Sequence, residues 1–267
     1  MVCCQLSRTV ALDLPSSLFA ELPLLYDIYG TICKAGRRSA VDAQRLLNKL
    51  YEKHWNDIAK LQSKHPELSA PLLIKAPKSY FEQNVKLMII GQQTRGWDGR
   101  DIGSALKCYE DFNFGEHYYS SPFWNITRKV ESALGIDKYA IVWSNLNRCD
   151  YNEKRPPMEI ENELRILLPV LLGEIEILKP DVIFFYTGPS FDGHIKQAFT
   201  GSRFEPAINT FSERKLSRIR HDLLPHHSYR TYHPLYLRLS GIEPRFVEYV
   251  KNIAGKDGLY SARSRAK

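Results

Sequence analysis

From Val85 onward, apolar runs that end in polar or glycine-bearing turns alternate with segments whose apolar residues have helical spacing. The four apolar runs, which predict strands, are Lys86–Gly91, Tyr139–Asn145, Pro180–Gly188 and Tyr229–Pro234. The three helical segments cover residues 121–135, 157–179 and 188–199. Apolar strands without alternation, separated by helices, favour an α/β fold with a mostly parallel sheet.

The first 80 residues contain no strand candidate and are expected to be helical. A helical stripe of apolar residues follows Ser39, a typical N-cap residue. It consists of Val41, Leu47, Leu50, Tyr51, Trp55, Ile58 and Leu61. Two prolines in residues 63–71 then predict a linker. We therefore expect an N-terminal helical extension (1–80), an α/β domain (81–255) and a basic tail (256–267).

Length and charge add information about partners. With 267 residues, of which 43% are hydrophobic, the chain can bury the core of one large domain. Lys and Arg together number 37 against 30 for Asp and Glu, which gives a net charge of +7. This excess suits a polyanionic partner, nucleic acid first, although a basic soluble protein without such a partner is equally consistent with charge alone.

The cysteines are few and scattered: Cys3, Cys4, Cys33, Cys108 and Cys149. Together with the lack of a recognisable secretion signal, they predict reduced thiols in the cytoplasm. The most apolar stretch is interrupted by Pro169, Glu174 and Glu176, so no membrane span is expected. These features predict a soluble cytoplasmic protein, which we expect to be monomeric.

Ligands of parallel α/β sheets bind beyond the carboxyl ends of the strands. The polar residues expected at this edge are Gln92, Gln93, Asn145, Asn147 and His233. Amide groups donate and accept hydrogen bonds in fixed directions, so they suit a planar ligand such as a nucleobase. The sequence therefore predicts recognition of a flat ligand at this edge.

Other common chemistries lack their motifs. Ser190 is not followed two residues later by glycine, which excludes a nucleophile elbow, and residues 91–99 lack the Lys-Ser/Thr ending of a phosphate loop. Cys3 and Cys4 are adjacent, and His226 and His227 would point in different directions on a regular element. We expect no metal and no cofactor.

Four segments resemble, in order, the signature regions of the uracil-DNA glycosylase superfamily, nearest its iron–sulfur-type branch. "MIIGQQTRGWDG" (Met88–Gly99) stands where the family has a glycine followed by Gln or Glu. "SPFWNITRKVESALGI" (Ser121–Ile136) is similar to the Pro-Phe helix that follows. Trp143–Gly188 looks like the central stretch, with its strand-ending Asn, Arg-Pro segment, long helix and Lys-Pro strand. "TYHPLYLR" (Thr231–Arg238) is similar to the Tyr-His-Pro signature.

The resemblance implies a three-layer α/β sandwich around a four-stranded, mostly parallel sheet, which binds a base extruded from DNA. In that family, the matching residues would have two kinds of role. The catalytic set would be Gln92, Gln93 and His233. The substrate-binding set would be Gly91, Phe123, Asn145, Tyr236, Leu237 and Arg238.

The individual roles follow from the same resemblance. His233 would donate a hydrogen bond to the base carbonyl, Asn145 would read the Watson–Crick edge, and Phe123 would stack on the base. Residues 236–238 would enter the minor groove, with Leu237 as an apolar wedge and Arg238 on phosphate. Structural alternatives stay open: His233 could hold a loop, Asn145 could cap a turn, and Phe123 and Leu237 could belong to the core.

Two departures from the family pattern affect the expected activity. The acid that orients water in the family is absent after Gly91, where Gln92, Gln93 and Thr94 follow, and an amide cannot take a proton at neutral pH. Asp98 and Asp101 come later in the same segment. Of the four cysteines that an iron–sulfur cluster needs, only Cys149 has a matching position, so no cluster is expected.

A basic segment precedes the His233 strand. It contains Arg203, Arg214, Lys215, Arg218 and Arg220, which could contact phosphate or form a solvated face. Two hypotheses therefore remain. The chain is a DNA glycosylase that hydrolyses an N-glycosidic bond, or it is a weakly active or inactive protein of that fold which binds nucleic acid or a nucleobase.

Overall fold

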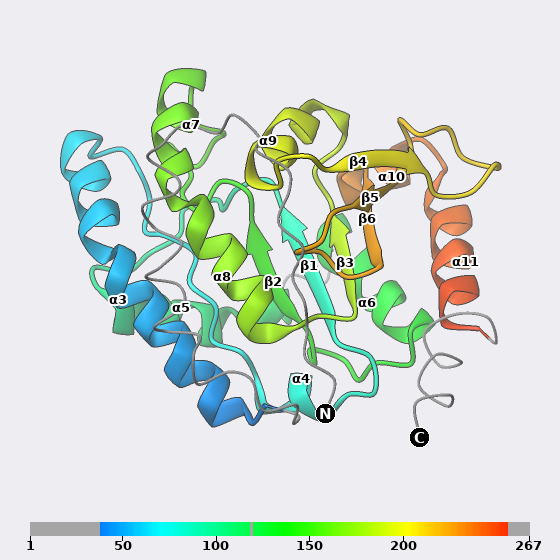
Figure 1. Cartoon of the computed structure of the whole chain (residues 1–267), viewed down its shortest axis with the longest axis horizontal. Helices are drawn as coiled ribbons and strands as arrows, with labels where there is room; N and C mark the ends of the chain where they lie inside the picture. The colour runs from blue at the N-terminus through cyan, green and yellow to red at the C-terminus, as the bar shows by residue number, and fades with distance from the viewer. Residues whose placement is uncertain (1–37, 118–119, 256–267) are drawn as a thin grey trace, which may run out of the picture. The chain divides into compact units, whose positions relative to one another are not determined.

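A six-stranded mixed sheet forms the centre of the computed structural model, which describes residues 38–117 and 120–255 (Figure 1). The predictions for residues 1–37 and 256–267, including those for Cys3, Cys4 and Cys33, lie outside the described residues. The strands are β1 (Leu87–Gly91), β2 (Val142–Asn145), β3 (Val182–Phe185), β4 (Arg203–Pro206), β5 (Leu216–Arg220) and β6 (His227–Thr231). Their order in the sheet is β2-β1-β3-β6-β5-β4.

The four predicted strands are present, but the expected four-stranded sheet is incomplete. β2, β1, β3 and β6 pair in parallel, and β4 and β5 extend the sheet as an antiparallel hairpin beside β6. The hairpin was missed because β4 is largely exposed and β5 carries arginines between its apolar residues, so neither gives the apolar run of a buried strand. The sheet is therefore mixed at one edge.

Helices separate β1, β2, β3 and β4 along the chain, whereas β4, β5 and β6 follow one another without a helix between them. They are α3 (Ala40–Lys64), α4 (Lys78–Glu82), α5 (Ile102–Phe112), α6 (Pro122–Ala133), α7 (Met158–Leu164), α8 (Leu168–Leu178), α9 (Asp192–Ala198), α10 (Pro234–Leu239) and α11 (Glu243–Ala254). Three short 3₁₀ turns are η1 (Asn113–Gly115), η2 (Arg165–Leu167) and η3 (Pro189–Phe191). In the described part of the chain, no helix is both long and apolar enough to cross a bilayer.

The helices cover both faces of the sheet. Alternate side chains of a strand point to opposite faces, so Trp143 and Ser144 of β2 mark the two sides. Trp143 packs against Trp124 of α6, whereas Ser144 hydrogen-bonds to Glu174 of α8. Helix α11 packs beside α6, and α3 packs on α8 (Figure 1). The result is an α/β arrangement with the sheet buried between helical layers.

The helix expected after Ser39 is confirmed as α3. The Ser39 side chain accepts a hydrogen bond from the Asp42 backbone, the normal N-cap contact. Of the predicted stripe, Leu47, Tyr51 and Ile58 are buried, whereas Val41 is exposed. Helix α3 belongs to the same compact unit as the sheet.

The long helix predicted over residues 157–179 is divided. It forms α7 and α8 with the 3₁₀ turn η2 between them. Pro169 lies in the first turn of α8, where its missing N–H costs nothing, but it cannot continue an α-helix from the preceding turn. This proline therefore sets where the second helix begins.

Helix α6 contains a fully buried carboxyl group, Glu131. Burial raises its pKa to about 7, against the attraction of Arg128, whose Nε lies 2.9 Å from Oε2. An acid whose pKa is raised from 4.5 to about 7 by folding binds its proton more tightly in the folded state. We therefore expect the free energy of unfolding to fall as pH rises from 4.5 to 7, by about 3 kcal/mol from this group.

Urea unfolding at a series of pH values measures this effect. In Glu131→Gln, which still accepts a hydrogen bond from the Tyr139 backbone, most of the fall should disappear. Glu110→Gln, at an exposed position on α5, serves as the control and should keep the wild-type profile. Identical pH profiles for Glu131→Gln and the wild type would contradict the assignment.

Candidate functional site

The predicted site residues of three strands converge at the carboxyl edge of the parallel strands. Gly91 and Asn145 are register partners at the ends of β1 and β2, and His233 follows β6 by two residues. Gln92 links this edge to β3, because its Nε2 donates a hydrogen bond to the Thr187 carbonyl over 2.8 Å. This is the convergence that a parallel sheet imposes on the residues after its strands.

Only glycine fits at position 91, because the Asn145 amide occupies the space that a side chain would need. A Cβ at Gly91 would collide with Asn145 Oδ1 and would lie 3.5 Å from Cε2 of Phe123. The glycine is required here for close approach of neighbouring groups, not for an unusual backbone angle. Gly91, Phe123 and Asn145 therefore form one contiguous cluster.

The Asn145 amide has a fixed orientation. Its Oδ1 accepts a hydrogen bond of 3.1 Å from the indole Nε1 of Trp143, which lies two residues earlier on the same face of β2. An indole N–H only donates, so the oxygen of the amide must face Trp143 and the NH₂ group must face away. Asn145 is 1% exposed, and its Nδ2 has no hydrogen-bond partner in the described structure.

Aromatic rings join His233 to this cluster. The Phe123 ring lies 5.8 Å from the His233 ring between centroids, with a tilt of 42°. Phe123 also meets Tyr186 edge to face at 5.5 Å and Trp143 at 6.2 Å. Phe123 thus stands between the asparagine of one strand end and the histidine of another.

His233 is held as the neutral Nε2–H tautomer. It is the N-cap of α10, and its Nδ1 accepts a hydrogen bond of 3.2 Å from the Leu235 backbone N–H. Burial lowers the pKa of His233, so the ring is uncharged at neutral pH and its proton is on Nε2. The imidazole therefore offers one N–H donor that the fold leaves available.

Gln92 and Gln93 differ in whether their side-chain amides are already hydrogen-bonded within the protein. Gln92 is used structurally, since its side chain bonds to Thr187 and its carbonyl accepts from the Asn147 backbone. Gln93 has a buried Oε1 without a partner among the residues described. Gln93 therefore retains a free acceptor, whereas Gln92 mainly joins β1 to its neighbours.

Three strand ends in a row carry a buried polar atom that lacks a partner. These atoms are Asn145 Nδ2 at the end of β2, Gln93 Oε1 after β1 and Thr187 Oγ1 after β3, all within the described chain. A buried donor or acceptor without a partner costs about 1–3 kcal/mol. Native proteins rarely keep several of them together, so this sheet edge is a candidate for contact with a polar ligand or with water.

The carboxylates near this edge are engaged in structural contacts. Asp150 accepts hydrogen bonds from Thr94 Oγ1 and from three backbone N–H groups, which fixes the turn after β1. Burial acts to raise the pKa of Glu161, but hydrogen bonds from Arg155 and Asn147 outweigh it and hold the pKa below the usual value. Asp101 caps α5, and Asp98 is exposed.

Helix α10 corrects one predicted role. Leu237 is fully buried, so it is part of the core and is not presented as a wedge. The exposed apolar residues of α10 are Leu235 (46%), Tyr236 (50%) and Leu239 (76%). Arg238 is exposed and forms an ion pair with Glu243 at 3.2 Å. The resemblance implies a loop at residues 236–238, but these residues lie in α10, which His233 caps and Pro234 begins.

Trp143 was not among the predicted site residues. An aromatic residue in an apolar strand is normally assigned to the core, so the sequence does not indicate the hydrogen bond from Trp143 to Asn145. The available signal was its spacing: residues two apart on a strand share a face, and Trp143 is two residues before the candidate Asn145.

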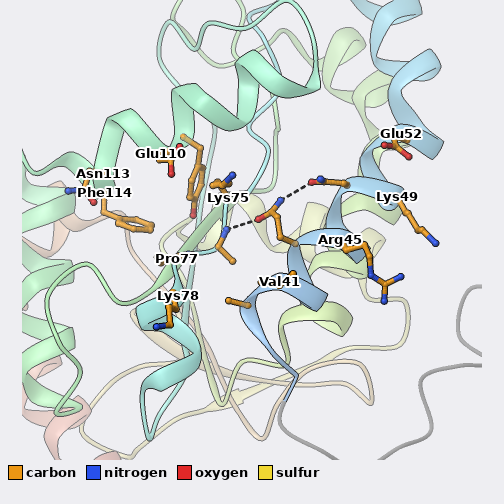
Figure 2. A pocket seen from close by; sticks show the side chains of 15 residues that line it. Val41, Arg45, Lys49, Glu52, Lys75, Pro77, Lys78, Glu110, Asn113 and Phe114 are labelled. Atoms are coloured by element: carbon orange, nitrogen blue, oxygen red, sulfur yellow. Dashed lines mark hydrogen bonds between the residues drawn. The ribbon is translucent and has the colours of Figure 1, made fainter.

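A separate hollow lies between the first half of α3, residues 75–78 and the end of α5 (Figure 2). Its volume is about 740 Å³, and Arg45, Lys49, Lys75 and Lys78 share its wall with Glu52 and Glu110. None of the predicted site residues lines it. Ala76 N donates to Gln44 Oε1 across the hollow, a contact between α3 and the segment before α4.

Comparison with family models and with curated protein sequences gave no match. Within residues 38–117 and 120–255, no group of three or more His, Cys, Asp or Glu side chains is arranged to hold a metal ion. The strand-end cluster is the candidate site because it joins predicted residues from neighbouring strand ends and holds buried polar atoms without partners in the described structure.

Proposed function

We propose that the chain is a uracil-DNA-glycosylase-like protein that holds an extruded base at the carboxyl edge of its sheet and hydrolyses the N-glycosidic bond. The support is the order of four motifs along the chain and four parallel strands that bring their polar ends together. An excess of seven positive charges is consistent with a DNA substrate.

The orientation of Asn145 is the observation that carries this proposal. Its free NH₂ group donates, so it pairs with a base that presents a carbonyl and not with one that presents an amino group. Uracil has a carbonyl oxygen where cytosine has an amino group, and hypoxanthine has a carbonyl oxygen where adenine has an amino group. The amide would therefore separate a deaminated base from its parent.

His233 would stabilise the leaving base. In the reaction the C1′–N bond breaks and both of its electrons go to the base, while a water oxygen bonds to C1′. The proton that this water loses passes to solvent, and the released base anion takes up a proton from solvent. The neutral Nε2–H would donate to the carbonyl oxygen on which negative charge develops. Phe123 lies beside this imidazole and would stack on the base.

The engaged carboxylates favour a second candidate, a protein that binds the base without turnover. Asp150 and Glu161 are committed to other groups, and Gln93 can orient a water molecule but cannot accept its proton. An enzyme without a free general base would gain its rate only from stabilising the departing base, and it would be slow.

Single-turnover assays distinguish the two candidates. Oligonucleotides that contain one uracil or one hypoxanthine are incubated with excess protein and cleaved at abasic sites with alkali; cytosine and adenine strands are the controls. We expect cleavage of the deaminated strands alone, and its loss in His233→Ala. Binding of these strands without cleavage supports the second candidate, and absence of both binding and cleavage refutes the proposal.

A further inference from the structure

We infer that the β4–β5 hairpin is a second contact with the substrate, in which Arg214 and Lys215 bind the phosphodiester backbone beside the extruded base. This inference rests on the proposed function and concerns a part of the sheet that the motifs do not cover. The hairpin lies beside β6 at one edge of the sheet, and β6 is followed in the chain by α10 (Figure 1).

The strand register places the hairpin tip at the site edge. β5 runs antiparallel to β6, and Leu216 at its start pairs with Thr231 at the end of β6. Residues 207–215, which connect β4 to β5, therefore lie beyond the carboxyl end of β6. His233 is two residues past the same point.

The connection is fixed in place by groups behind it. The Arg230 side chain is fully buried; its Nη1 donates to the Arg214 carbonyl over 2.7 Å, and its Nε and Nη2 bond to Asp192. Thr231 Oγ1 donates to the Lys215 carbonyl over 3.1 Å. These contacts use the backbone of Arg214 and Lys215 and leave their side chains outside.

A third anchor comes from α11. The Arg245 guanidinium donates to the Thr210 carbonyl and lies 4.8 Å from the centre of the buried Phe211 ring. The tip of the hairpin is thus held at Thr210, Arg214 and Lys215. A loop fixed at three points loses little conformational entropy when it binds, which suits a contact surface.

Register also separates the five basic residues of this segment. Arg203 pairs with Arg220 toward the opposite end of the hairpin, and Arg220 forms an ion pair with Glu205. Arg218 bonds to His226. Arg214 and Lys215 are exposed at the site edge and have no ion-pair partner among the described residues, although Glu213 is exposed next to them. Two unpaired cations at the site edge fit an anionic strand.

The salt dependence of DNA binding tests this inference. In the double variant Arg214→Gln/Lys215→Gln, the slope of log affinity against log salt should fall by about 2, because each phosphate contact contributes about 0.9. Affinity for free uracil should stay unchanged, since the base site is intact. The probes are single- and double-stranded oligonucleotides with one uracil.

A matched control removes the same charge elsewhere. Arg45→Gln/Lys49→Gln on α3, beside the hollow of Figure 2, should keep the wild-type slope. An unchanged slope in the hairpin variant, or an equal fall in the control, overturns the inference while base binding still supports the proposed function. A wild type without affinity for DNA or uracil overturns both. Equal thermal midpoints establish that the variants are folded.

Discussion

Asn145→Asp is expected to lower the single-turnover rate on uracil-containing DNA by about 10²- to 10³-fold, as the loss of one oriented donor does in other sites. Trp143 can still donate to the new carboxylate, but the NH₂ donor is lost and a negative charge faces the departing anion. If the protein binds without turnover, the same substitution should weaken its affinity for uracil.

Excision kinetics with excess protein, and uracil titration by calorimetry, measure the two effects. Asn252→Asp on the exposed side of α11 makes the same chemical change away from the site and should behave as the wild type. If Asn145→Asp retains both rate and affinity, the amide does not read the base.

Glu174→Ala is expected to lower the free energy of unfolding by about 3–5 kcal/mol, the cost of leaving a buried charge without its partner. Glu174 receives both terminal nitrogens of Arg148, and neither side chain is more than 2% exposed. Tyr51 and Ser144 donate to the same carboxylate, so the group joins α3, α8 and β2.

Urea unfolding measures this loss. Glu82→Ala, which breaks an exposed ion pair with Lys78 on α4, should cost less than about 1 kcal/mol. The double variant Arg148→Met/Glu174→Leu should recover part of the stability, because no unpaired charge remains. A cost for Glu174→Ala as small as that for Glu82→Ala would show that the buried pair is dispensable.

The buried strands could be predicted because a strand covered on both faces is apolar at nearly every position. β1 is buried throughout, as its apolar sequence Leu-Met-Ile-Ile-Gly predicts. The same rule fails for β4, which is largely exposed, and for β5, where arginines interrupt the apolar residues. The layer arrangement was predictable to the same extent as the strands.

The candidate site was predictable as a location but not in its detail. Gln92, Asn145 and His233 lie at the same edge of the sheet because the carboxyl ends of parallel strands lie there, which topology alone implies. The direction of the Asn145 amide depends on the Trp143 indole, and the His233 tautomer depends on the Leu235 backbone, both contacts that need coordinates. The burial of Leu237 could not be predicted, because residues 236–238 were expected in a loop and instead form part of α10, whose inner side faces the core.

Arg230 has a consequence for the size of substrate that the protein could accept. Its buried guanidinium ties the hairpin backbone to β6 and α9, and β6 also leads to His233. The backbone positions of the imidazole and of the two tip residues are therefore set by one strand. If the strand end binds a base and the tip binds phosphate, as we propose, a nucleotide whose sugar–phosphate linkage is lengthened or shortened would fit the two contacts less well.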